Sequence, residues 1–281
     1  NSTMKKQADY IKRIEIKSLW GRKDRDIVWN LRPDVNILSG INGIGKSTIL
    51  NKSIHRLNSM VSGELKGTEE PNVRLAFYPE DATFIRFSVI RSFDRPLMHS
   101  DLFEKIADKN VGTELDWQIY QLQRRYLDYQ VNIGNRIIEL LSSGEPDAQV
   151  KAAEVSLPKK KFQDIIDDLF SETGKKILRK SNEIAFEQVG ETLYPHQLSS
   201  GEKQILAILL TVLIQDNQHF TLFMDEPEVS LHIEWQQRLI SLIRELNSNV
   251  QIILTTHSPA VIMNGWMDAV TEVSDITESL I

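Results

Sequence analysis

A glycine-rich loop between an apolar strand and a helix constrains this chain most. Residues 40–48 read Gly-Ile-Asn-Gly-Ile-Gly-Lys-Ser-Thr, a full match to the pattern G-x-x-x-x-G-K-[ST]. In such a loop, glycines let backbone N–H groups surround a β-phosphate, the lysine reaches the β- and γ-phosphates, and the serine hydroxyl ligates Mg²⁺. A strand expected over 35–38 and a helix over 48–60 supply the required context. The sequence therefore predicts a nucleotide site that includes Gly40, Asn42, Gly43, Gly45, Lys46, Ser47 and Thr48.

A second anion-binding feature begins the most apolar helix. Residues 198–204 read Leu-Ser-Ser-Gly-Glu-Lys-Gln. Ser199 and Glu202 have the spacing of a capping box, which marks a helix N-terminus. The glycine in the first turn and the unpaired N–H groups there favour an anion. Taken alone, this stretch is more simply an ordinary capped core helix, but the chain also carries the phosphate loop.

Two strand ends carry candidate catalytic side chains. An apolar strand over 219–224 ends in Asp225-Glu226-Pro227, and a strand over 250–255 is followed by Thr256-His257-Ser258-Pro259. An α/β sheet presents its chemistry at the C-terminal ends of its strands. A solvated turn before Pro227 is the alternative for the two carboxylates, and a structural role is the alternative for His257.

The composition excludes several classes of protein. The chain has 281 residues and no cysteine, which excludes disulfides, thiolate metal sites and cysteine nucleophiles. A net charge of −6 argues against a globally basic nucleic-acid-binding protein. The longest apolar run, 205–214, is about half the length that a membrane-spanning helix requires. We therefore expect a cytoplasmic protein that does not enter a membrane.

The middle of the chain has a helical texture. From Glu114 to Leu141, apolar residues recur mostly at steps of four and three, which is typical of a long helix with a heptad-like seam. A second helix is expected over 158–173, because Pro158 suits a first helical position and Gly174 a helix end. We predict an α/β lobe over 4–91, a helical insertion over 92–195 and a second lobe over 196–281.

Together these motifs resemble those of the ATP-binding-cassette (ABC) superfamily of P-loop ATPases, and most closely its soluble SMC, RecF and OLD-like AAA branch. Residues 40–48 are similar to the Walker A loop, 198–204 to the signature motif and 220–226 to Walker B with its catalytic glutamate. Residues 229–232 are similar to the D-loop and His257 to the switch histidine. The resemblance implies an α/β P-loop fold with a mixed sheet core, N-terminal antiparallel strands and a helical insertion.

The resemblance also implies the chemistry of ATP hydrolysis. Ser47 and, through water, Asp225 would hold Mg²⁺. Glu226 would orient or deprotonate the attacking water, and His257 would contact the γ-phosphate. Lys46 would offset the charge that develops on the transferred phosphoryl group.

The same resemblance implies an ATP-dependent head-to-tail homodimer. In that arrangement, Ser199, Gly201 and Glu202 of one copy belong to the nucleotide site of the other. An interface that excludes water would strengthen the attraction of the helix N-terminus for the phosphate.

Two departures from the family pattern stand out. No glutamine occurs over 52–117, where the family's Q-loop glutamine is expected. Arg86, Ser88 or Arg91 would have to replace it, or the coupling differs. In the signature motif, Ser200 stands in place of a glycine.

These features favour one function over an alternative. The main hypothesis is a soluble ABC-type ATPase that couples its ATP state to DNA or to a partner effector, in DNA maintenance or anti-phage defence. The alternative is the nucleotide-binding subunit of a membrane transporter, which the missing glutamine and the long heptad helix disfavour. A binding switch with little turnover is disfavoured by Glu226. Contact with DNA rests only on the basic residues 159–161 and 175–180, and such runs are usually solvated.

Overall fold

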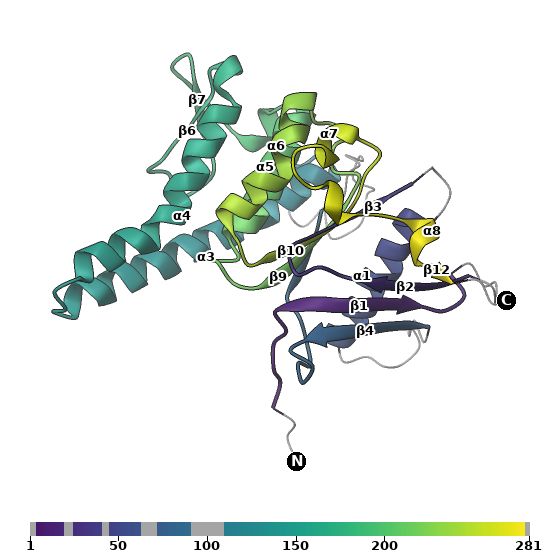
Figure 1. Cartoon of the computed structure of the whole chain (residues 1–281). Helices are drawn as coiled ribbons and strands as arrows, with labels where there is room; N and C mark the ends of the chain where they lie inside the picture. Colours follow the sequence, from purple (N-terminus) through teal and green to yellow (C-terminus); the bar gives the residue numbers. More distant parts are fainter. Residues whose placement is uncertain (1–3, 20–24, 41–44, 63–71, 91–109, 279–281) are drawn as a thin grey trace.

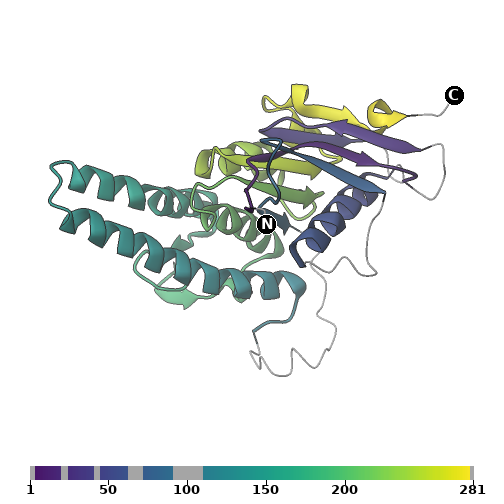
Figure 2. The same ribbon diagram turned by 90° about the horizontal axis from the view of Figure 1, so that it is seen from below.

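The computed structural model describes residues 4–19, 25–40, 45–62, 72–90 and 110–278. Two sheets pack around one helix, and further helices cover the opposite face of the larger sheet (Figures 1 and 2). The predicted α/β P-loop fold with N-terminal antiparallel strands and a helical insertion is confirmed, and its parallel and antiparallel strands form separate sheets of the core. Among the described helices, none combines the length and the apolar character that crossing a membrane would need.

A parallel sheet forms the centre of the molecule. Its strands are arranged in the order β11 (Val270–Glu272), β3 (Val35–Ser39), β10 (Val250–Thr255), β9 (Phe220–Asp225) and β5 (Phe87–Ile90). Alternate residues of a strand enter opposite cores, as Leu222 and Phe223 of β9 do. Because both faces are covered, these strands have the near-continuous apolar sequences that parallel sheets require.

An antiparallel sheet contains the N-terminal strands. Its order is β12 (Thr277–Glu278), β2 (Asp26–Asn30), β1 (Tyr10–Ile16) and β4 (Val73–Tyr78). Helix α1 (Lys46–Ser62) lies between the two sheets, where Ile49 and Leu50 join Ile14 and Trp29 in one core. The alternating pattern of β1 and β2 thus buries one face of this sheet against the helix that follows the phosphate loop.

Helix α5 (Ser200–Leu213) lies at the centre of the helical layer. Every residue from Glu202 to Leu213 is buried. The helix contacts α3 (Glu114–Ser142), α4 (Ala148–Leu169) and α6 (Ile233–Leu246) on its sides, and β5 on the sheet. A helix that is apolar on all sides is expected in such a position.

Helices α3 and α4 form a hairpin that projects from the sheets (Figure 1). The spacing of apolar residues predicted α3 to within one residue. The predicted seam is buried from Leu115 to Ile133, whereas its last two members near the tip, Ile137 and Leu140, are only partly buried. A small antiparallel sheet follows, made of β6 (Lys176–Ile177), β7 (Phe186–Gln188) and β8 (Glu191–Leu193).

The predicted start of the second helix was wrong. Helix α4 begins at Ala148, ten residues before the predicted Pro158, which lies inside the helix. Proline cannot donate to the carbonyl four residues earlier. Here that residue is Glu154, which is exposed, so water can reach this side of the helix. The predicted end at Gly174 was also wrong for this helix: α4 ends at Leu169, and Gly174, with a left-handed backbone, ends the short 3₁₀ turn that follows.

Candidate active site

The C-terminal edge of the parallel sheet brings the candidate catalytic residues together. Lys46 begins α1 directly after the phosphate loop, Asp225 ends β9, and His257 follows β10 by two residues. Because β3, β10 and β9 are neighbours in that order, their C-terminal ends lie side by side. The topology therefore joins Lys46 and His257, which are 211 positions apart in the sequence.

Lys46, His257 and Glu226 form one charged cluster. Lys46 Nζ lies 2.7 Å from the Gly40 carbonyl oxygen and 3.0 Å from each ring nitrogen of His257. Glu226 also contacts the imidazole, through its Oε1 and His257 Nε2. Burial lowers the pKa of Lys46 below its usual 10.5, and the charge of Glu226 is the first of the opposing effects. A γ-phosphate here would meet an ammonium group, an imidazole and a candidate general base.

Ser47, Asp225 and Thr255 form a hydroxyl–carboxylate group beside this cluster. Asp225 Oδ1 accepts hydrogen bonds from Ser47 Oγ at 3.0 Å and from Thr255 Oγ1 at 2.5 Å. Thr255 is the direct register partner of Asp225 in the parallel pair β9–β10. The sequence did not point to Thr255, because its role depends on that register.

The donor set around Asp225 suits Mg²⁺. Ser47 and Asp225 offer oxygen ligands, which hard cations prefer. In the part of the chain that the structure describes, no three His, Cys, Asp or Glu side chains gather to hold a metal. A cation at this point would complete its shell with phosphate and water oxygens, as Mg²⁺ commonly does.

Glu226 has an unusual backbone conformation. Its φ of 48° lies in the left-handed region, which residues other than glycine seldom adopt. The Glu226 N–H donates to the Thr255 carbonyl oxygen at 3.1 Å and to Thr255 Oγ1 at 3.0 Å, which holds the turn. Such conformations cluster at functional sites. Here it directs the carboxylate toward His257.

The described parts of the phosphate loop fit an anion site. Gly40 has a φ of 147° and Gly45 a φ of 97°, so both positions favour glycine. Thr48 lies in the first turn of α1, whose N-terminus favours an anion. Asn42 and Gly43 lie outside the described residues.

The capping box of the signature stretch is confirmed. Ser199 Oγ accepts from the Glu202 N–H at 3.2 Å, and the Ser199 N–H donates to Glu202 Oε1 at 3.0 Å. The other oxygen, Oε2, lies 3.1 Å from Lys175 Nζ in a buried ion pair. At Gly201 a Cβ atom would lie 2.6 Å from the Ser230 carbonyl oxygen. The contacts of Ser199, Gly201 and Glu202 thus fix the start of α5, and their binding of nucleotide stays a prediction.

Two of the residues considered as replacements for the missing glutamine, Arg86 and Ser88, form hydrogen bonds with Gln215. Arg86 Nη2 donates to Gln215 Oε1 at 2.9 Å, and Gln215 Nε2 donates to Ser88 Oγ at 3.4 Å. Arg91 lies outside the described residues. Arg86 and Ser88 therefore link β5 and the residue before it to Gln215, which lies just after α5.

Gln118 is a residue that the sequence analysis did not consider. It lies near the start of α3, and its Nε2 donates to the Val89 carbonyl oxygen at 3.3 Å, close to the C-terminal end of β5. It is the first glutamine after that strand. That order was visible in the sequence, but its contact with β5 required the fold.

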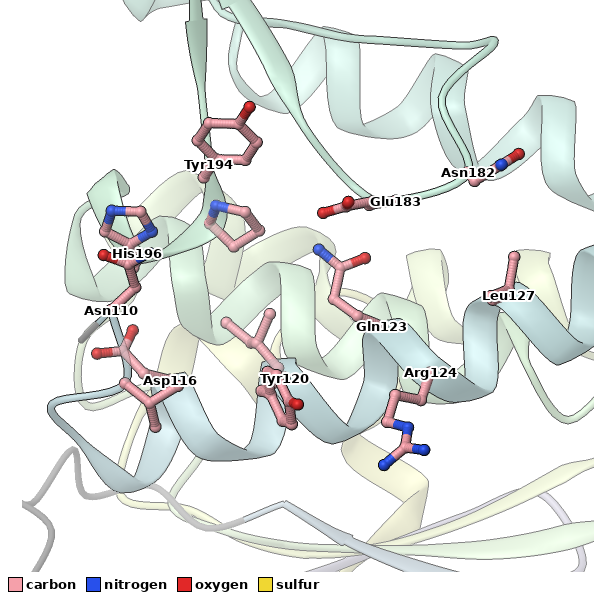
Figure 3. A pocket seen from close by; sticks show the side chains of 13 residues that line it. Asn110, Asp116, Tyr120, Gln123, Arg124, Leu127, Asn182, Glu183, Tyr194 and His196 are labelled. Carbon is pink, nitrogen blue, oxygen red and sulfur yellow. The ribbon is translucent and has the colours of Figure 1, made fainter. Parts of the chain in front are cut away.

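A cavity of about 550 Å³ lies beside the signature stretch. Figure 3 shows residues of α3, among them Asp116 and Gln123, on one side and Tyr194 and His196 on the other. Asp116 also lies 2.9 Å from Lys203 of α5. A buried ion pair therefore connects the α3 wall of the cavity to α5, the helix that begins with the signature stretch.

Comparison with known proteins identifies the family. A family model described as "AAA domain, putative AbiEii toxin, Type IV TA system" matches residues 35–264, which is most of the chain. The chain belongs to this family. With its phosphate loop, this AAA domain is an ABC-type P-loop ATPase.

Other matches are partial or remote. Over 86 residues the AAA domain is 36% identical to an uncharacterized protein of Dictyostelium discoideum, covering 28% of this chain and 11% of that protein. Over 97 residues it is 33% identical to the Retron Ec83 probable ATPase of Escherichia coli, covering 31% of this chain and 18% of that protein. The matched segments therefore span less than a fifth of either relative. An SmcHead bound to the C-winged helix domain of ScpA has a TM-score of 0.49 and 14% identity, with 91% of each chain covered.

Proposed function

We propose that this AAA domain binds Mg-ATP at the loop between β3 and α1 and hydrolyses it at the interface of a head-to-tail dimer. The observation that carries the proposal is the convergence of Lys46, Glu226 and His257 beside the Ser47–Asp225 pair. These groups come from three neighbouring strand ends, where an α/β sheet binds its ligand.

Each side chain has a defined task in this mechanism. Ser47 and Asp225 would hold Mg²⁺, which supplies charge neutralisation for the phosphates when bound. Lys46 binds the β- and γ-phosphates. Glu226 accepts a proton from the attacking water, and His257 donates a hydrogen bond to the γ-phosphate.

The dimer supplies the remaining part of the site. Ser199 and Ser200 are exposed at the N-terminus of α5, where unpaired N–H groups can receive an anion. Among the described residues of one copy, this terminus contacts Lys175 and Thr173 and lies against Ser230. A second copy can therefore present its γ-phosphate to this exposed terminus.

We favour a partner effector protein over DNA as the molecule whose activity the ATP state of this domain controls. The family description includes the words "putative AbiEii toxin, Type IV TA system", and one relative is named "Retron Ec83 probable ATPase". Both support a role in defence more than DNA maintenance or transport. DNA contact has less support, because Lys175 is buried against Glu202 and Arg179 is paired with Asp164 and Asp167.

Molecular mass in solution with Mg-ATP tests the composite site. Glu226→Gln should retain ATP, because the amide cannot accept a proton from water, and its mass should double. Adding Ser199→Arg should abolish the doubling. Ser248→Arg is the matched control, since Ser248 is exposed in the turn before β10. This turn lies at the N-terminal end of the strand, opposite to the end that carries the candidate site. A mass of Glu226→Gln that does not respond to ATP would contradict the head-to-tail site, and phosphate release by the unmutated protein tests hydrolysis separately.

A further inference from the structure

A buried carboxylate lies behind the switch histidine. Glu228 follows Glu226 by two residues and is only 7% exposed. Its Oε1 accepts hydrogen bonds from Thr256 Oγ1 at 2.6 Å and from the His257 N–H at 3.0 Å. Both donors belong to the loop that leaves β10 and presents the His257 ring to Lys46. The Glu228 carboxylate therefore holds the first two residues of that loop, Thr256 and His257, in position.

The loop is also fastened on its other side. Ser258 Oγ donates to Gln236 Oε1 at 2.5 Å, and Gln236 Nε2 donates to the Leu231 carbonyl oxygen at 2.8 Å. Glu228 and Leu231 belong to the same segment after β9. The His257 loop and the segment 228–231 are thus one hydrogen-bonded unit.

The burial of Glu228 is unfavourable for the stability of the fold. Its Oε2 is buried and has no hydrogen-bond partner among the described residues. Burying a carboxylate with an unpaired oxygen is unfavourable, and an apolar side chain of similar size would avoid that cost. The presence of a glutamate at position 228 is therefore better explained by its role in orienting its two donors, Thr256 Oγ1 and the His257 N–H.

We propose that Glu228 is a positioning residue for ATP hydrolysis, which fixes His257 where its ring meets Glu226 and Lys46. The inference rests on the proposed function and adds a residue to it. It also links the switch histidine to the signature stretch, because Ser230 of the same segment lies against Gly201.

The expected signature is a loss in kcat without a comparable change in KM. Glu228→Ala removes both acceptor contacts, so the His257 ring leaves the cluster, while the phosphate-loop contacts to ATP remain. We expect kcat to fall by about 10- to 100-fold, as it does when a residue that orients a metal-binding histidine is removed. Glu228→Gln keeps an oxygen acceptor at Oε1 and should retain kcat to within about threefold of the unmutated value.

A double-mutant cycle with His257→Ala separates positioning from a structural role. If Glu228 acts through His257, then Glu228→Ala lowers kcat no further once His257 is gone. A further fall by the same factor in the His257→Ala background would overturn the proposal. If His257→Ala itself leaves kcat unchanged, the role of His257 in the proposed function fails, which is a distinguishable result. Should Glu228→Ala not fold, Glu228→Met, which has similar volume and no strong acceptor, takes its place in the cycle.

Discussion

Lys203 of α5 and Asp116 of α3 form a buried ion pair, with 2.9 Å between Nζ and Oδ1. Among the described residues, Asp116 Oδ1 accepts no well-directed hydrogen bond, so this contact is primarily electrostatic. The preceding residue of α5, Glu202, pairs in turn with Lys175. Two consecutive residues in the first turn of the signature helix are thus neutralised by opposite charges from the helical insertion. The insertion and this helix are therefore expected to move together.

Removing one member of the Asp116–Lys203 pair should destabilise the protein. Asp116→Asn leaves the Lys203 ammonium buried and unpaired, which costs about 3–5 kcal/mol for a pair of this kind. Urea unfolding measures the loss. The double variant Asp116→Leu with Lys203→Met should recover most of it, because neither residue then carries a charge. A single variant as stable as the unmutated protein would show that the pair is solvated in solution.

Thr255→Val should impair hydrolysis while leaving the fold intact. The change removes the hydroxyl that donates to Asp225 and accepts from the Glu226 N–H. Residues that orient a metal ligand from behind typically contribute about 10- to 100-fold in affinity or activity. Phosphate release should fall by that range, and the Mg²⁺ concentration for half-maximal rate should rise.

The matched control for Thr255 is Thr211→Val. Thr211 is also buried, but its hydroxyl donates to the Ala207 carbonyl oxygen within α5. Equal losses of activity in the two variants would contradict a specific role for Thr255.

Gly201→Ala should be harmful where Gly134→Ala is not. A Cβ at Gly201 would lie 2.6 Å from the Ser230 carbonyl oxygen, so α5 and the segment after β9 must separate. Overpacking of this kind costs about 1–3 kcal/mol, and the displaced segment should lower phosphate release. At Gly134, in the middle of α3, nothing lies within 4 Å of an added Cβ. There alanine should stabilise the helix by roughly 0.5–1 kcal/mol, as thermal unfolding can measure.

The buried ammonium group of Lys46 should make stability depend on pH. Its pKa in the folded protein is below the 10.5 of an ordinary lysine, chiefly because of burial. In the window between the folded pKa and 10.5, the unfolded chain binds more protons than the folded protein, so stability rises with pH. Lys46→Met removes this contribution. The free energy of unfolding of the unmutated protein minus that of the variant should grow as the pH rises toward 10.5; a constant difference would contradict the shift.

The sequence predicted those parts of the fold that local patterns determine. The strand over 250–255 and the long helix from Glu114 follow from apolar runs and heptad spacing, and the capping box from two residues three apart. The start of α4 was missed because a proline such as Pro158 is compatible with two positions, the first turn of a helix or the interior of a helix that tolerates it. The exposed face at Glu154 decides between them, and that exposure depends on tertiary structure.

The candidate site was only partly visible for a similar reason. Lys46, Asp225, Glu226 and His257 belong to recognisable motifs. Thr255 and Glu228 gain their roles from contacts across a strand pair and a turn. Thr255 ends its strand opposite Asp225 because the two strands are parallel and in a fixed register. No pattern within a short window of sequence encodes that register.

The site also has a consequence for when activity begins during synthesis. Ser47 and Asp225 are 178 positions apart, and Lys46 and His257 are 211 apart. A ribosome therefore releases the phosphate loop well before the carboxylates and the histidine that complete the site. Contacts of such long sequence separation form late in folding. A nascent chain can expose its nucleotide loop, but it cannot use ATP until β9 and β10 have entered the sheet between β3 and β5.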